Sequence, residues 1–95
     1  MTEAQVERLA LLAEECAEVI VVVGKILRHG FESYDPTHPN GVDSPTNQEM
    51  LGHELGDVEY ALSLLSKHGE VSARDVLKGR ALAEKKKPKY LHYQE

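Results

Sequence analysis

The segment EECAEVIVVVGKILRHG at residues 14–30 and the segment TNQEMLGHELGDVEYALSLL at residues 46–65 decide the fold of this chain. In both, apolar residues recur every three or four positions, which is the period of an α-helix with one buried face. Each segment also carries two acidic residues three positions apart, Glu15 with Glu18 and Glu54 with Asp57. Residues at this spacing point the same way on a helix. The sequence therefore predicts two long helices, each with a pair of carboxylates on one face.

The first predicted helix runs from about Thr2 to His29, with a capping box between Thr2 and Gln5 and with Gly30 as a left-handed cap. Its apolar residues form two stripes. The first stripe is free of charge and contains Val6, Leu9, Ala13, Cys16, Ile20, Val23 and Leu27. The second stripe contains Leu12, Glu15, Val19, Val22 and Ile26, and the glutamate interrupts it.

The second predicted helix covers residues 47–67, opened by a capping box between Thr46 and Glu49 and stopped by Gly69. We expect its core stripe to consist of Leu51, Leu55, Val58, Leu62 and Leu65. A neighbouring stripe holds Met50, Glu54, Asp57, Ala61 and Leu64, and is apolar except at its two carboxylates.

Residues 30–46 contain three prolines and read as a loop, which is long for so small a domain. A third helix is predicted over residues 72–87, capped by Ser72 and ended by Pro88. The chain is thus expected to be a single all-α domain spanning residues 1–95, built of long antiparallel helices.

The length of the first helix predicts an oligomer. A helix of about 28 residues is about 42 Å long, whereas a compact chain of this size has a radius of gyration of about 12–13 Å. The helix therefore overhangs its own domain with a wide apolar surface exposed. We expect partner copies to cover this surface and complete a helical bundle, as a dimer or a tetramer.

Composition excludes several classes of function. The net charge of −5 argues against a nucleic-acid partner. One cysteine forms neither an internal disulfide nor a zinc site, which indicates the cytoplasm as the compartment. No stretch reaches the roughly 18 apolar residues of a membrane span, and the first ten residues lack the layout of a signal peptide.

The two acidic pairs have two interpretations, as ordinary surface charge or as a functional site. On an ordinary surface helix, such pairs are solvated charge. Here both pairs interrupt apolar stripes, and clustered carboxylates in a half-buried groove repel one another unless they are protonated or bridged by cations. Two facing pairs would form a cage of hard oxygen ligands suited to Mg²⁺, with Mn²⁺ as a substitute. Glu14 lies beside the first pair and either reaches the same ion or faces water.

The motif E-x-x-E followed by E-x-x-D, in the context of EECAEV, KILRHG and HELGDV, resembles the MazG-like all-α nucleoside triphosphate pyrophosphohydrolases, especially their small phage versions. The resemblance covers roughly residues 6–66. Thirty-five residues, 19–53, separate the two pairs, which is longer than the family's usual spacer. The proline-rich loop accounts for the excess.

The resemblance implies Mg²⁺-dependent hydrolysis of a nucleoside triphosphate, such as a deoxynucleotide, to the monophosphate and pyrophosphate in the cytoplasm, or the host cytoplasm if the protein is phage-encoded. Divalent ions held by carboxylates neutralise phosphate oxygens and activate water. Glu15 or Glu18 would act as the general base; the sequence does not separate them.

Three further residues are candidates for substrate binding. Lys25 and Arg28 follow Glu18 on nearly the same side of the helix and would meet the β- and γ-phosphates. They would equally well be cations that favour a helix C-terminus. Asn47 would bind the base or sugar, or is a polar residue following a cap.

A second function stays open: a non-catalytic helical oligomer that binds nucleotide, metal or a protein partner. Two other metal patterns are excluded. His53-Glu54 lacks the second histidine of a zinc protease motif, and neither acidic pair includes the histidine of a di-iron bundle.

Overall fold

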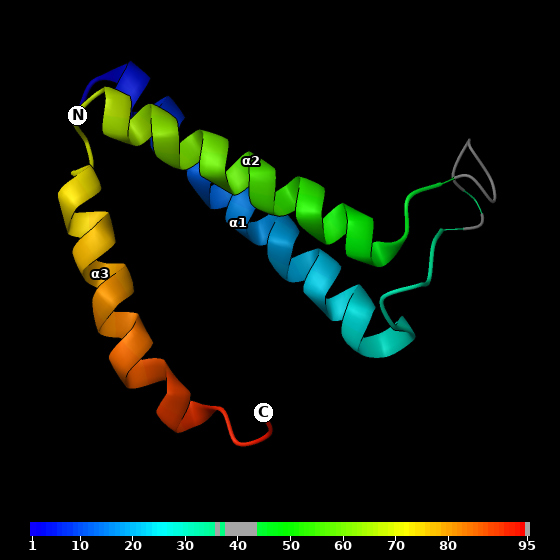
Figure 1. Cartoon of the computed structure of the whole chain (residues 1–95). Coiled ribbons are helices and arrows are strands. Elements are labelled where there is room, and N and C mark those ends of the chain that lie inside the picture. Colours follow the sequence, from blue (N-terminus) through cyan, green and yellow to red (C-terminus); the bar gives the residue numbers. More distant parts are fainter. Residues whose placement is uncertain (36, 38–43, 95) are drawn as a thin grey trace.

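The protein is a helical hairpin followed by a projecting third helix (Figure 1). The structure, a computed structural model, describes residues 1–35, 37 and 44–94. Helix α1 spans Glu3–His29, α2 spans Asn47–Lys67, α3 spans Ala73–Lys86, and a short 3₁₀ helix, η2, spans Lys87–Tyr90. No strand occurs in these described ranges, which confirms the all-α prediction.

The starts of all three helices are set by side-chain caps that the sequence predicts. Thr2 accepts from the backbone N–H of Gln5 at 3.1 Å, and the Gln5 side chain accepts from the Thr2 N–H at 2.9 Å. Thr46 and Glu49 form the same reciprocal box at α2. The Ser72 hydroxyl accepts from the third residue of α3. These bonds satisfy N–H groups that a helix start leaves unpaired, so each helix begins within one residue of its predicted start.

The ends of α1 and α2 depend on glycines with positive φ. Gly69 has φ 82°, which suits the turn that stops α2. Gly30 has φ 89° and donates its N–H to the Ile26 carbonyl at 2.7 Å. Its ψ of 167° lies outside the left-handed helical region, so the predicted left-handed cap is wrong in form. The backbone instead leaves α1 in an extended direction that essentially only glycine adopts.

Part of the predicted 30–46 loop lies outside the described residues, namely 36 and 38–43. The described remainder is non-helical, as predicted. Two backbone hydrogen bonds tie it to the start of α2: Asn47 N–H donates to the Ser33 carbonyl at 2.7 Å and Gln48 N–H donates to the Phe31 carbonyl at 3.0 Å. The end of α1 and the start of α2 are therefore held together directly.

The interface between α1 and α2 is formed by the second stripe of α1, the one interrupted by Glu15. Val22 of this stripe is buried, and its remaining members are partly buried. From α2, Ala61 and Leu65 are each 1% exposed. The predicted core stripe of α2 is right at Leu65 and wrong at Leu55, which is 47% exposed. The carboxylate-bearing faces are therefore the ones that pack together.

The first stripe of α1, which carries no charge, faces solvent instead. Ile20 is 72% exposed, Leu27 is 82% exposed, and Ala13 and Cys16 near the middle are also exposed. Among the residues that the structure describes, no other element covers the stripe. An apolar row of this length on a helix surface is unusual for a monomer.

Helix α3 leaves the hairpin at the turn of residues 68–72 and diverges from α1 and α2 (Figure 1). None of its residues is buried. Arg8 of α1 forms an ion pair with Glu70, which closes the hairpin at this end. Among the described residues, no helix combines the length and the apolar character that crossing a membrane requires.

Candidate metal centre

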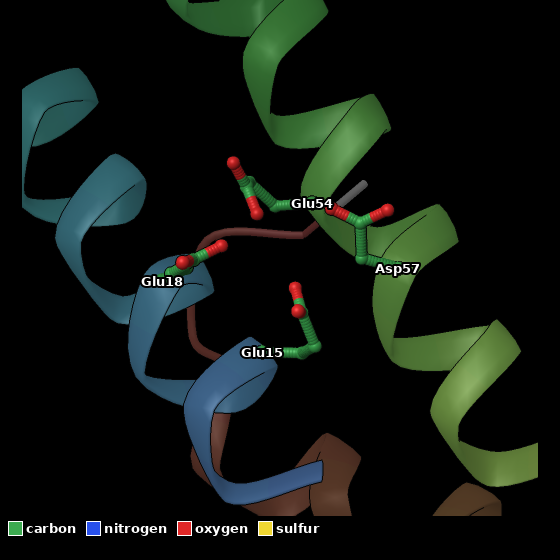
Figure 2. A group of neighbouring side chains, drawn as sticks. All are labelled: Glu15, Glu18, Glu54 and Asp57. Atoms are coloured by element: carbon green, nitrogen blue, oxygen red, sulfur yellow. The ribbon is translucent and has the colours of Figure 1, made fainter. Parts of the chain in front are cut away.

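The two acidic pairs meet across the helical hairpin. Glu15 and Glu18 come from the middle of α1, and Glu54 and Asp57 come from α2. Their side chains point into the space between the two helices (Figure 2). Each contributes one carboxylate oxygen to a group in which all four oxygens lie within 4.8 Å of one another. We call these four residues the carboxylate cluster. The predicted convergence of the two pairs is therefore present in the fold.

Burial divides the cluster into an inner and an outer half. Glu15 and Glu54 are partly buried, whereas Glu18 and Asp57 are exposed. One oxygen of Glu15 and one of Glu54, the Oε2 atom in each case, are out of contact with solvent and have no hydrogen-bond partner. Buried oxygens without a partner are costly in a folded protein, so both atoms indicate that a ligand or a proton belongs in this space.

The crowding of carboxylates in the cluster raises the pKa values of its two partly buried members, Glu15 and Glu54. Burial, followed by the negative charges of Glu18, Asp57 and Glu14, raises the pKa of Glu15 above its ordinary value. A side-chain hydrogen bond with Glu18, together with burial and the neighbouring negative charges, raises the pKa of Glu54. Both shifts have the direction expected when carboxylates share a site without a cation.

The arrangement fits a hard divalent cation. Mg²⁺ binds oxygen ligands at 2.0–2.1 Å in an octahedron, so two oxygens on opposite sides of the ion are about 4.2 Å apart. The four oxygens of the cluster lie within 4.8 Å of one another, which is close to that separation. The set contains neither nitrogen nor sulfur, which favours Mg²⁺ or Mn²⁺ over Zn²⁺. Glu15, Glu18, Glu54 and Asp57 would hold the ion.

Glu14, the fifth predicted ligand, is not in the cluster. It is exposed and contributes only its negative charge to the environment of Glu15. The reason is helical geometry: consecutive residues lie about 100° apart around a helix, since one turn takes 3.6 residues. Glu14 and Glu15 therefore cannot both face α2.

The three predicted substrate-binding residues come together in one pocket at the loop end of the hairpin, where α1 ends and α2 begins. This pocket has a volume of about 250 Å³, and Lys25, Arg28 and Asn47 line it. Lys25 and Asn47 also line an adjoining hollow of about 140 Å³. We call the two together the basic pocket. Lys25 lies seven residues after Glu18, so the basic pocket begins about 10 Å along the hairpin from the carboxylate cluster.

Asn47 has a structural task within this pocket. Its Nδ2 donates to the Gly30 carbonyl at 3.2 Å, and the residue is 9% exposed. The side chain thus ties the start of α2 to the end of α1, in keeping with the structural alternative.

Sequence reasoning missed several residues that line the basic pocket. They come from the end of α1 and from the loop, and they are His29, Ser33, Tyr34, Asp35, Ser44 and Pro45. Their only signal in the sequence is that they flank Lys25, Arg28 and Asn47. Loop residues carry no periodicity from which their direction could be inferred.

A larger hollow lies elsewhere, between α2 and α3. It has a volume of about 740 Å³ and is mainly apolar, with Leu62, Val76 and Leu77 in its lining. It contains no member of the carboxylate cluster. We therefore identify the candidate site by its ligand chemistry and not by the size of the hollow.

Compared with models of protein families, with curated proteins and with solved structures, the chain matches none of them. Any functional assignment therefore rests on the residues of the carboxylate cluster, on their surroundings in the sequence, and on the geometry described above.

Proposed function

We propose that this protein is a metal-dependent pyrophosphohydrolase that converts nucleoside triphosphates, including deoxynucleotides, into nucleoside monophosphate and pyrophosphate. The observation that carries the proposal is a four-carboxylate cluster with a basic pocket about two helical turns away. A nucleotide chelated to divalent cations presents positive charge to the cluster and phosphate oxygens to the pocket. The motif resemblance described above supports the same class of reaction.

The carboxylate cluster and the basic residues have separate roles in the proposed reaction. When bound at the cluster, divalent cations supply charge neutralisation on the phosphates and lower the pKa of bound water. Lys25 and Arg28 bind phosphate oxygens through charge-assisted hydrogen bonds. Glu15 or Glu18 accepts the proton of the attacking water.

The direct test is a product assay. The full-length protein is incubated with Mg²⁺ or Mn²⁺ and a panel of ribonucleoside and deoxyribonucleoside triphosphates, and products are separated by ion-exchange chromatography. The expected result is equal amounts of monophosphate and pyrophosphate, without diphosphate. Release of diphosphate and inorganic phosphate, or the absence of turnover with every nucleotide and both metals, would overturn the proposal. Nucleotide binding without turnover would favour the non-catalytic alternative.

Glu18→Gln provides the test of the site itself. Glu18 is exposed at the mouth of the cluster, so the substitution should leave the circular dichroism spectrum unchanged and abolish hydrolysis. Glu7→Gln is the matched control, because Glu7 is an exposed glutamate of α1 outside the cluster. Full activity of Glu18→Gln would remove this residue from the reaction.

A further inference from the structure

The charges of this chain are divided between two regions of opposite sign. Residues 1–72, which contain the helical hairpin, carry thirteen acidic and four basic residues. Residues 73–94 comprise α3, η2 and the tail that follows, and they carry seven basic and two acidic residues, a net charge of +5. We call residues 73–94 the lysine-rich arm. The net charge of −5 for the whole chain therefore conceals a strongly basic segment.

The lysine-rich arm stands apart from the acidic hairpin. Helix α3 diverges from α1 and α2, and the far end of the arm lies clear of both helices in Figure 1. Helix α3 alone is about 21 Å long at 1.5 Å per residue, whereas charges are screened over about 8 Å at physiological ionic strength. The far end of the arm therefore presents positive charge that the acidic side chains of the hairpin do not cancel.

The cations of the arm are exposed and largely unpaired. All seven are exposed, and among the described residues only Arg80 forms an ion pair, with Glu84 at 3.4 Å. Four of the cations are concentrated within five residues at the far end, and they are Lys85, Lys86, Lys87 and Lys89. A block of lysines this dense attracts polyanions, because each phosphate that it neutralises releases a counterion.

Exposed aromatic rings adjoin these lysines. Tyr90 is 73% exposed and Tyr93 is 94% exposed. The Lys87 Nζ lies 6.0 Å from the centroid of the Tyr90 ring, at the limit of a cation–π contact. Cations that bind the sugar-phosphate backbone, placed beside rings on which bases stack, are the combination that holds single-stranded nucleic acid.

The arm lacks the apolar face that a membrane-surface helix requires. The large apolar side chains of α3 are Val76, Leu77 and Leu82. At about 100° per residue they point in directions about 100–140° apart, evenly around the helix axis. This helix is therefore suited to binding through charge and stacking and not to insertion into lipid.

We propose that the lysine-rich arm binds single-stranded nucleic acid, with its four far-end lysines on phosphates and with Tyr90 and Tyr93 stacked on bases. Bases in a duplex are stacked on one another and are not available to the tyrosines, so single strands bind more tightly than duplexes. The proposal rests on the arm alone and not on the chemistry of the carboxylate cluster.

Fluorescence anisotropy of a labelled oligothymidylate, titrated with the full-length protein, tests the proposal. A chelator is present throughout, so that no metal bridges phosphates to the carboxylate cluster. With four phosphate contacts, the slope of log affinity against log salt concentration should be about −2.8, so a fourfold rise in salt should weaken binding about 50-fold. A duplex of the same length should bind more weakly.

Substitutions in the arm, each matched by one in α2, test the contribution of charge and of stacking separately. Lys86→Gln combined with Lys87→Gln should reduce the slope to about −1.4, whereas Lys67→Gln, at an exposed position of α2, should leave the slope unchanged. Tyr93→Ala should weaken binding about 5- to 150-fold, whereas Tyr60→Ala, at a position 61% exposed on α2, should not weaken it. All these positions are exposed, so the circular dichroism spectrum should stay unchanged.

Three outcomes would overturn the proposal: no binding at low salt, equal effects of the arm substitutions and their α2 controls, or duplex binding at least as tight as single-strand binding. Vesicles of phosphatidylcholine and phosphatidylserine in equal amounts test a membrane as the partner. Sedimentation of the protein with these vesicles, without binding of the oligothymidylate, would assign the arm to anionic lipid and refute binding to nucleic acid.

Discussion

Replacing Glu54 with glutamine should stabilise the metal-free protein at neutral pH and remove its response to divalent cations. The side chain is partly buried in the carboxylate cluster, with one orphaned oxygen and a raised pKa. Glutamine keeps the shape and removes one negative charge from a group of four. A substitution at a candidate binding site is therefore expected to raise the melting temperature (Tm), which is the reverse of the usual effect of mutation.

The expected cation response follows from binding linkage. A cation present at about 100 times its Kd stabilises the folded state by about 2.7 kcal/mol. For a domain of about 95 residues, each kcal/mol raises Tm by about 4–8 °C, so the wild-type shift is about 11–22 °C. If the lost ligand weakens binding about a hundredfold, the same cation concentration gives Glu54→Gln only about 0.4 kcal/mol.

The pH dependence has a defined sign. A raised pKa means that the folded, metal-free state binds more protons than the unfolded state above the ordinary value of 4.5. The free energy of unfolding therefore falls as the pH rises from that value through the raised pKa values of Glu15 and Glu54. Saturating Mg²⁺ should abolish this loss, because the ion replaces the protons.

Circular dichroism at 222 nm is the appropriate assay, since the chain is helical and contains no tryptophan. Melting curves are recorded at one protein concentration, with a chelator or with Mg²⁺, for wild type, Glu54→Gln and the control Glu59→Gln. Glu59 is an exposed acid of α2 outside the cluster. If Glu54→Gln melts below the wild type in chelator, or shows the same Mg²⁺ shift as the wild type, then the cluster is not a cation site.

Three further substitutions test the fold and the basic pocket. Leu65→Ala should cost about 2–5 kcal/mol in chemical denaturation, because the side chain is 1% exposed, whereas the exposed Leu55→Ala should cost under about 0.5 kcal/mol. Thr46→Ala should lower stability by about 1 kcal/mol through loss of the capping box, which Thr46→Ser should retain. Lys25→Met should raise the nucleotide KM about 10–100-fold without lowering Tm, because a charge-assisted hydrogen bond contributes about 1.5–3 kcal/mol. Lys67→Met, distant from the basic pocket, should leave the KM unchanged; equal effects of the two lysine substitutions would place the pocket elsewhere.

Local chemistry in the sequence was sufficient to predict the helices. Caps at Thr2, Thr46 and Ser72 and stops near Gly30 and Gly69 are determined within a few residues, so they can be read without tertiary information. The conformation of Gly30 was the exception, because a positive φ is compatible with more than one ψ.

Which face of each helix packs could not be predicted, because periodicity reveals faces but not their partners. The uncharged first stripe of α1 is the more hydrophobic, yet the interrupted second stripe contacts α2. The same limit applies to α3, whose cap predicts a helix but says nothing about its divergence from the hairpin. Within the candidate site, the three-residue spacing within each acidic pair was sufficient to predict the carboxylate cluster. The direction of the Glu14 side chain could not be predicted, because it depends on how α1 is rotated about its axis relative to α2.

Gly30 gives the basic pocket an unusual vulnerability. A methyl group added there would meet no atom within 4 Å, so alanine would fit by volume, but its backbone angles disfavour any side chain. Relaxation of those angles would redirect the chain just after Arg28. It would also displace the Gly30 carbonyl, to which the Asn47 side chain donates a hydrogen bond. A substitution at Gly30 would therefore disturb the proposed phosphate binding without changing the identity of Lys25, Arg28 or Asn47, and screens that substitute only polar residues would overlook it.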